Sequence, residues 1–159
     1  MNDTALRETL ARALAWKDAH ATFDDAVADF PAQLRGVRPD GVPWSAWQLV
    51  EHIRIAQQDI LEFSLPGEYR ESAWPDAYWP KEPTPPSEQA WHDAIAAVRR
   101  DRDAMARLAL DEAVDLAAPT PHGTGQQTHL RAVLLVLDHT AYHVGQLVLL
   151  RRLLGQWQG

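Results

Sequence analysis

The positions of the prolines constrain the fold of this chain more than any other feature of its sequence. All eleven prolines of the 159 residues fall in three stretches, 31–43, 66–86 and 119–121. Proline lacks the amide donor that a helix interior needs and clashes with the preceding turn, so long helices form only between these stretches. The four remaining segments carry apolar residues at helical spacing and no convincing strand alternation. The sequence therefore predicts an all-α protein, a four-helix bundle.

The expected helices and connections have definite bounds. Ser45 and Gln48 form a capping-box pattern, Ser87 can cap a further helix, and Gly155 suits a left-handed C-cap. At 159 residues the chain has room for one contiguous core, so we predict a single domain over residues 1–159. We expect helices over Thr4–Phe30, Ala46–Leu65, Glu88–Leu110 and from Thr124–Thr128 to Leu154, with connections at Pro31–Pro43, Pro66–Pro86 and Asp111–Gln127.

Charge and cysteine content exclude several classes of function. The net charge of -7 repels phosphate backbones, so no nucleic-acid partner is expected. No stretch reaches the roughly 20 consecutive apolar residues of a membrane span, and the acidic N-terminus Met1–Leu10 lacks a signal-peptide pattern. We therefore expect a cytoplasmic protein that does not enter a membrane. The chain has no cysteine, which leaves histidine to carry any soft-metal chemistry.

Three histidines form a candidate metal site. His139 and His143 are four residues apart, so both project from one face of their helix, on the apolar stripe that continues through Leu147. His52 lies in the inward stripe of the helix over Ala46–Leu65. Three imidazoles at one depth of a bundle satisfy one another poorly without a shared ion, so one divalent metal ion is predicted. The alternative is that each is a core histidine with ordinary hydrogen-bond partners.

Two well-known metal motifs do not fit these histidines. The protease motif His-Glu-x-x-His needs a glutamate after its first histidine, where this chain has Thr140. Di-iron bundles need a glutamate three residues before each histidine, and here Leu49, Val136 and Thr140 occupy those positions. Both chemistries are therefore excluded.

Two segments of the sequence resemble the DinB-like (YfiT-like) superfamily. They are Trp47-x4-His52 and Asp138-His139-x3-His143-x-Gly145-Gln146, which continues into Leu149–Leu154. The resemblance implies a four-helix bundle with long crossover connections, often a homodimer, in which three histidines matching His52, His139 and His143 bind a divalent metal. Characterised relatives include metal-dependent thiol transferases that use a low-molecular-weight thiol, and a maleylpyruvate isomerase of the mycothiol type. The segment Trp74-Pro75-x3-Tyr78-Trp79-Pro80 resembles a subgroup to which no reaction is assigned.

A three-histidine site leads to one principal hypothesis about function and two alternatives. Three neutral imidazoles suit Zn²⁺ or Ni²⁺ and leave a position for water or substrate, as in catalytic sites. The principal hypothesis is a metal-dependent enzyme on a small-molecule substrate, by transfer of an external thiol or by hydrolysis. The alternatives are a non-enzymatic, stress-related protein that binds the metal or a small ligand, and an interaction module that the metal only stiffens.

Other polar residues are candidates for secondary roles. Asp59, two turns after His52, can orient a ligand or approach the metal, and Gln146 and Asp138 can support the ligands from behind. His20 is expected inside the first helix stripe as a hydrogen-bonded core residue, with an acid or base role as the alternative. His122 is expected to be a loop residue or to line the mouth of the site.

Two further stretches have a predicted environment. The aromatic residues of the 66–86 connection are expected to be ordered, either covering one end of the core or forming a pocket wall. The charged run Arg99–Asp103 is expected to be a solvated helix face. His92 and His129 are expected at the surface.

Overall fold

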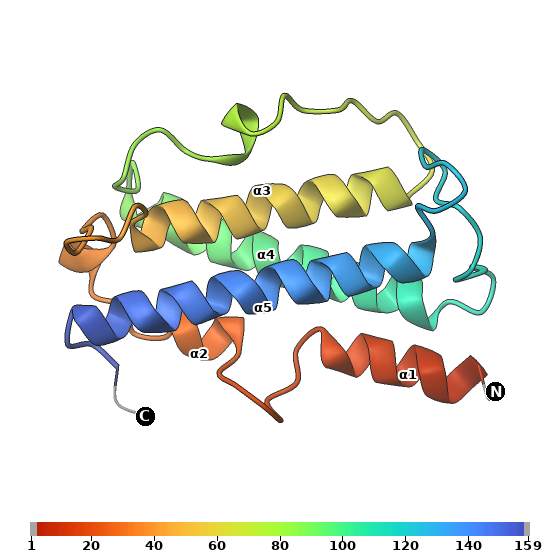
Figure 1. Cartoon of the computed structure of the whole chain (residues 1–159), viewed down its shortest axis with the longest axis horizontal. Helices are drawn as coiled ribbons and strands as arrows, with labels where there is room; N and C mark the ends of the chain where they lie inside the picture. The colour runs from red at the N-terminus through yellow and green to blue at the C-terminus, as the bar shows by residue number, and fades with distance from the viewer. Residues whose placement is uncertain (1–2, 158–159) are drawn as a thin grey trace.

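Three long helices form the frame of the molecule. The computed structural model describes residues 3–157. Its long helices are α3 (Ala46–Ser64), α4 (Glu88–Leu110) and α5 (His129–Leu153), and α3 packs against both of the others. Two short helices, α1 (Asp3–Ala13) and α2 (Phe23–Val27), lie one after the other along the fourth side (Figure 1). The predicted all-α fold is confirmed, with the fourth helix of the bundle divided in two.

The described residues contain little other regular structure. Two single-turn 3-10 helices, η1 (Ala32–Leu34) and η2 (Asp76–Tyr78), interrupt the first two long connections. Within residues 3–157 the only extended pairing is an isolated antiparallel bridge between Pro119 and Thr128. This bridge closes the third connection next to the start of α5.

The starts of the long helices follow the capping signals in the sequence. The Ser45 hydroxyl accepts the amide of Gln48, and the Gln48 side chain accepts the amide of Ser45, both at 3.2 Å. Ser87 accepts the amide of Ala90 at 3.0 Å, and Gly155 has the expected left-handed φ of 69°. Side-chain caps satisfy the first free amides of a helix, which explains why the predicted bounds of α3 and α4 agree closely with the structure.

The prediction of one helix over Thr4–Phe30 is wrong. Helix α1 ends at Ala13, and a second capping box begins α2, in which Thr22 accepts the amide of Asp25 at 3.1 Å and Asp25 accepts the amide of Thr22 at 3.0 Å. These local side-chain bonds stabilise a new helix start in place of a continuous helix. His20 consequently lies in the intervening loop and is exposed, so the prediction of a core histidine is also wrong.

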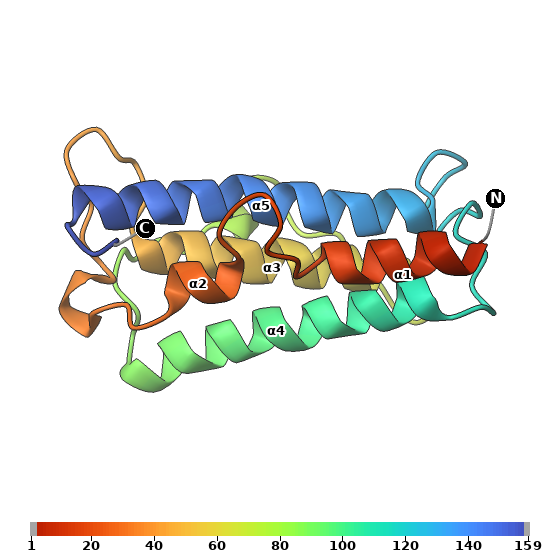
Figure 2. The ribbon, with the colours of Figure 1, turned by 90° about the horizontal axis from the view of Figure 1, so that it is seen from below.

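The break in the first helix changes the environment of the charged run on α4. Arg99 and Arg102 both donate to Asp24 at the start of α2, at 2.6 and 2.7 Å. Arg102 is half-buried and Asp101 is only 5 % exposed. The prediction of a solvated Arg99–Asp103 face therefore holds for three of the five residues but is wrong for Asp101 and Arg102, because α2 lies beside this part of α4 (Figure 2).

The core has two parts that meet near the middle of α5. One part joins α2, the beginnings of α3 and α4, and the end of α5, around Leu49, Ile53, Trp91 and Leu147. The other joins α1, the end of α4 and the start of α5, around Met105 and Val136. The histidines of α5 lie between Val136 of one part and Val144 of the other.

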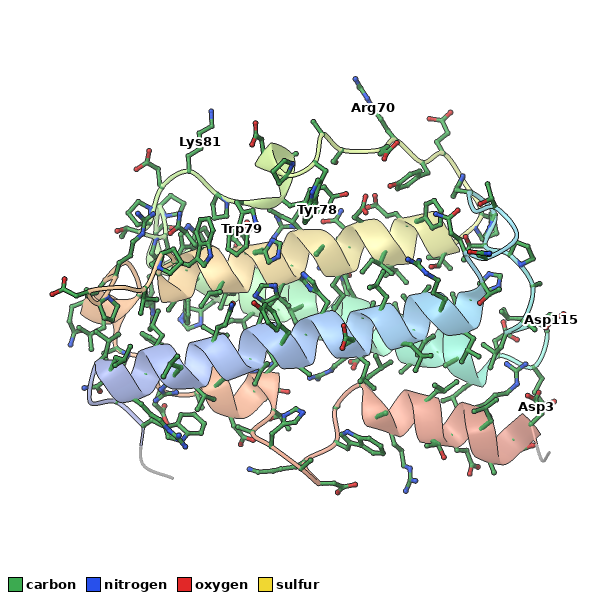
Figure 3. The ribbon with its side chains drawn as sticks, in the orientation of Figure 1. Asp3, Arg70, Tyr78, Trp79, Lys81 and Asp115 are labelled. Atoms are coloured by element: carbon green, nitrogen blue, oxygen red, sulfur yellow. The ribbon has the colours of Figure 1, made fainter. Side chains whose placement is uncertain are left out.

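The proline-rich connection 66–86 is fastened along the outside of α3 (Figure 3). The Tyr69 hydroxyl donates to Asp59 at 3.0 Å, the Gln48 amide donates to the carbonyl of Pro80 at 2.9 Å, and Ser45 donates to the carbonyl of Pro83. An ordered aromatic connection was predicted, and these contacts confirm it.

Two buried arginines connect the short helices to the long ones. Arg7 of α1 donates to the carbonyls of Ala109, Asp111 and Val114 at the end of α4, at 2.7 to 3.1 Å. Arg151 of α5 donates to the carbonyls of Ala26 and Ala28 at the end of α2, at 3.1 and 2.6 Å. Each guanidinium satisfies carbonyl groups that a helix end leaves without a partner.

Among the described residues, α5 is the one helix with the length and apolar composition of a membrane span. The core helix of a bundle meets the same criteria, and α5 contributes Val133, Val136, Leu147 and Leu150 to the buried core. The absence of a membrane partner remains a prediction.

Candidate metal centre

The structure brings His52, His139 and His143 together between α3 and α5. Their nearest possible ligand nitrogens all lie within 4.8 Å of one another. The Nε2 atoms of His52 and His139 are 3.0 Å apart. His52 and His143 are only 2 % and 6 % exposed, and His139 is half-buried. Because α5 presents two of the rings one turn apart and α3 presents the third, the site requires these two helices to pack together.

The outer nitrogens of two of the rings have hydrogen-bond partners. The Nδ1–H of His52 donates to the backbone carbonyl of Tyr78 at 2.8 Å. Since a carbonyl only accepts, the proton of the neutral ring lies on Nδ1, and Nε2 keeps its lone pair. His143 Nδ1 lies 2.7 Å from the Oε1 of Gln146 and takes the same tautomer. Hydrogen bonding of this kind orients histidine ligands in metal sites.

A stack of aromatic rings fixes the plane of His52. Trp79 lies parallel to the imidazole, with centroids 3.8 Å apart and planes at 6°. Trp44 covers the other face of Trp79, with centroids 3.9 Å apart. Stacking restricts rotation of the His52 ring and places an apolar indole over one side of the site. Figure 3 shows Tyr78 and Trp79 on the connection that runs over α3.

Burial keeps the three histidines neutral. Desolvation lowers the pKa of His52 below its ordinary value, against the raising effect of the Tyr78 carbonyl. Desolvation and the neighbouring histidines lower the pKa of His139 to about 4. Desolvation lowers the pKa of His143 to about 4, against the raising effect of the Gln146 hydrogen bond and with a smaller lowering effect of the neighbouring His52. At neutral pH the rings therefore offer lone pairs, the form that binds a metal.

The donor set and its spacing fit a divalent ion. Two imidazole nitrogens bound to one tetrahedral zinc ion at about 2.0–2.1 Å lie about 3.3 Å apart. The observed 3.0 Å between the Nε2 atoms of His52 and His139 is close to this separation. Two lone pairs facing each other at such a distance repel unless a cation or a proton lies between them. The three imidazoles could thus hold one divalent metal ion.

A comparison with known families agrees with this geometry. A model of the DinB superfamily matches residues 15–147, which include all three histidines. The chain belongs to the DinB superfamily. No curated protein and no solved structure matches it.

The other candidate residues of this DinB-superfamily chain lie at different distances from the centre. Gln146 supports His143, as predicted. Asp59 does not join the histidines, because its carboxylate accepts the Tyr69 hydroxyl. Asp138 is exposed, and His20 is exposed in the loop between α1 and α2 and is not part of the histidine group.

A cavity of about 630 Å³ lies between α3, α5 and the two long connections. Asp59 and His122 both line it. His122 is a loop residue, as predicted, and its place at the mouth of the metal site stays a prediction, because no histidine of the centre lines this cavity. Tyr69, Trp74 and Tyr78 form one wall, which favours the pocket-wall interpretation of the 66–86 connection.

The sequence did not reveal the Tyr78 carbonyl or the ring stack on His52. A backbone carbonyl carries no residue-type signal. Trp44 and Trp79 were visible as tryptophans beside prolines, but their contact with each other depends on how the connection folds back over α3.

Proposed function

We propose that this chain is a metal-dependent enzyme that holds one divalent ion on His52, His139 and His143 and acts on a small molecule. The observation that carries the proposal is the orientation of the rings. Nδ1 of His52 and of His143 faces an oxygen acceptor, which leaves the Nε2 lone pairs for a ligand in the centre. Hydrogen bonds of this kind fix the tautomer and the orientation of histidine ligands in metal sites.

The residues around the ion have separate roles. An ion held there supplies Lewis-acid chemistry, lowering the pKa of water or of a thiol that binds to it. The carbonyl of Tyr78 and the amide of Gln146 keep the protons of His52 and His143 on the outer nitrogens. Trp79 covers one side of the site, so substrate enters from elsewhere. Because three protein ligands leave a coordination position free, the site suits thiol transfer or hydrolysis.

Metal analysis of protein purified without an affinity tag tests the proposal. We expect about one zinc or nickel ion per chain in the unaltered protein and a loss of tight binding in His143→Ala. His92→Ala is the matched control, because His92 is an exposed histidine that contacts only Glu88 among the described residues. Stoichiometric metal in His143→Ala would show that the ligands are different residues.

Cobalt substitution separates the two reaction types. Thiols of low molecular weight added to the Co²⁺ form should give thiolate-to-metal absorption if the enzyme transfers a thiol. An unchanged spectrum counts against the thiol reaction and leaves hydrolysis.

Removal of the metal with a chelator distinguishes a catalytic role of the ion from a purely structural one. A large fall in thermal stability on chelation, together with no binding of any small molecule by the loaded protein, would identify the ion as a structural support.

A further inference from the structure

The cavity beside the metal centre has aromatic walls. Phe63 of α3 packs edge-on against Tyr69, with centroids 5.2 Å apart, and Trp74 packs against Tyr78 at 5.2 Å. All four rings line the cavity. Pockets with this lining bind planar or apolar parts of small molecules.

Two charges in the cavity wall lack partners. Glu71 lies on the 66–86 connection and Arg131 on the first turn of α5, so they belong to different walls. Within residues 3–157 neither side chain forms an ion pair or a hydrogen bond. The third charged residue, Asp59, already accepts the hydroxyl of Tyr69. The cavity is therefore lined by one guanidinium and two carboxylates, none of which forms an ion pair within the described residues, and Glu71 is the carboxylate without a hydrogen-bond partner.

The cavity and the metal centre share Tyr78, although none of the three histidines lines the cavity. Tyr78 belongs to both, because its ring lines the cavity while its carbonyl holds His52. On α5, Arg131, Leu135 and His139 follow at intervals of four residues on one helix face, and the first two line the cavity. Eight residues of helix span about 12 Å, so a small molecule can reach from Arg131 toward the histidines.

We propose that the cavity binds the substrate, and that this substrate is a zwitterionic small molecule with an apolar or planar middle. Its carboxylate would pair with Arg131, whose guanidinium matches a carboxylate in a two-point hydrogen bond. Its ammonium group would pair with Glu71, and its middle would lie against the rings of Tyr69 and Tyr78. This inference rests on the proposed function, because it places the substrate beside the catalytic metal.

Four probes of one shape test the charges separately. They are 4-(aminomethyl)benzoate, 4-methylbenzoate, 4-methylbenzylamine and the uncharged 4-methylbenzyl alcohol. Dissociation constants are measured by ligand-detected NMR titration against the zinc-loaded protein. The zwitterion should bind most tightly, with each charge improving affinity about tenfold over the alcohol.

Three variants test whether Arg131 and Glu71 account for the gain in affinity that each charge of the probe gives. Arg131→Met should remove the advantage of the carboxylate and leave that of the amine, and Glu71→Gln should do the reverse. Arg152→Met is the control, because Arg152 is an exposed arginine at the other end of α5 and does not line the cavity. All three positions are exposed, and circular dichroism verifies that the variants fold.

Two results would overturn the inference: an alcohol that binds as tightly as the zwitterion, or a probe ranking that Arg131→Met and Glu71→Gln leave unchanged. Metal analysis keeps this failure distinct from that of the proposed function. If the protein binds its metal but the dissociation constants of the probes do not depend on their charges, only the proposed zwitterionic substrate is refuted. If metal analysis finds no bound metal and the same titration of the metal-free protein still ranks the probes by charge, only the proposed metal centre is refuted.

Discussion

At the scale of single residues, Gln146 determines which nitrogen of His143 faces the other histidines. Replacing Gln146 with Ala removes the acceptor 2.7 Å from Nδ1 and frees the ring to rotate and change tautomer. We expect metal affinity to fall about 10–100-fold, the usual effect of losing such a partner. Competition with a chromogenic chelator measures it. Gln89→Ala, on the exposed face of α4, should leave the affinity unaltered.

The lowered pKa values of the histidines predict how the metal-free protein responds to acid. His139 and His143 have a pKa of about 4 when folded and an ordinary value of 6.5. The unfolded chain therefore binds more protons between these values, so the free energy of unfolding should fall as the pH decreases from about 6.5 to about 4. Urea unfolding after chelation measures this slope. An equal slope in a His139→Gln, His143→Gln variant would assign it to other groups.

The placement of His139 and His143 on one side of their helix was predictable from the sequence, because residues four apart lie on the same helix face. The pairing of His52 with them was inferred from its place in an apolar stripe and from the resemblance to a family. The position of His20 was not predicted, because its stripe assumed a helix that ends at Ala13.

At the scale of elements, the start of α2 depends on a capping box rather than on its five residues of helix. Thr22→Ala removes the acceptor of the Asp25 amide and should lower the free energy of unfolding by about 1 kcal/mol. Chemical unfolding followed by circular dichroism measures the change. Thr9→Ala is the control, because that hydroxyl is exposed and donates only to the preceding turn of α1. An equal effect of the two substitutions would contradict a role for the cap.

Helix starts were predictable where a cap preceded a long apolar stripe, as at Ser45 and Ser87. The same signal at Thr22 was hidden inside a segment without proline or glycine. Helical spacing of apolar residues shows where a helix can form, but a competing local cap decides where it stops.

At the scale of the whole molecule, Arg151 holds α2 against α5. Arg151→Met leaves the carbonyls of Ala26 and Ala28 without their charged donor in a site that is 8 % exposed. We expect the free energy of unfolding to decrease by about 2–3 kcal/mol, measured by urea titration. The neighbouring exposed Arg152→Met should change it by less than about 0.5 kcal/mol. Matching losses in both variants would mean that the carbonyl contacts contribute little.

The outer face of α5 is the surface on which we propose that two copies of the chain associate. Tyr142, Leu149 and Leu153 are 65, 55 and 54 % exposed and follow one another along this face. A dimer would remove these side chains from water. Sedimentation equilibrium should give twice the monomer mass, and Leu149→Lys should shift the protein toward monomer. A monomer in the unaltered protein would reject the association.

The bundle as a whole was predictable because the prolines divide the chain into helical lengths. Its fourth side and the course of the 66–86 connection were not, since both follow from contacts between residues distant in sequence. The cavity could not be predicted for the same reason, because its walls come from α3, α5 and two connections.

Two of the three histidines of the metal centre lie on α5 and one lies on α3. A single isolated helix can already chelate an ion through residues four apart, so α5 carries two of the three ligands before the tertiary structure exists. Capture of the third imidazole then requires α3 to dock. Metal present during refolding should therefore accelerate the packing of α3 against α5. The ion would then help the bundle to assemble in addition to its role in the reaction.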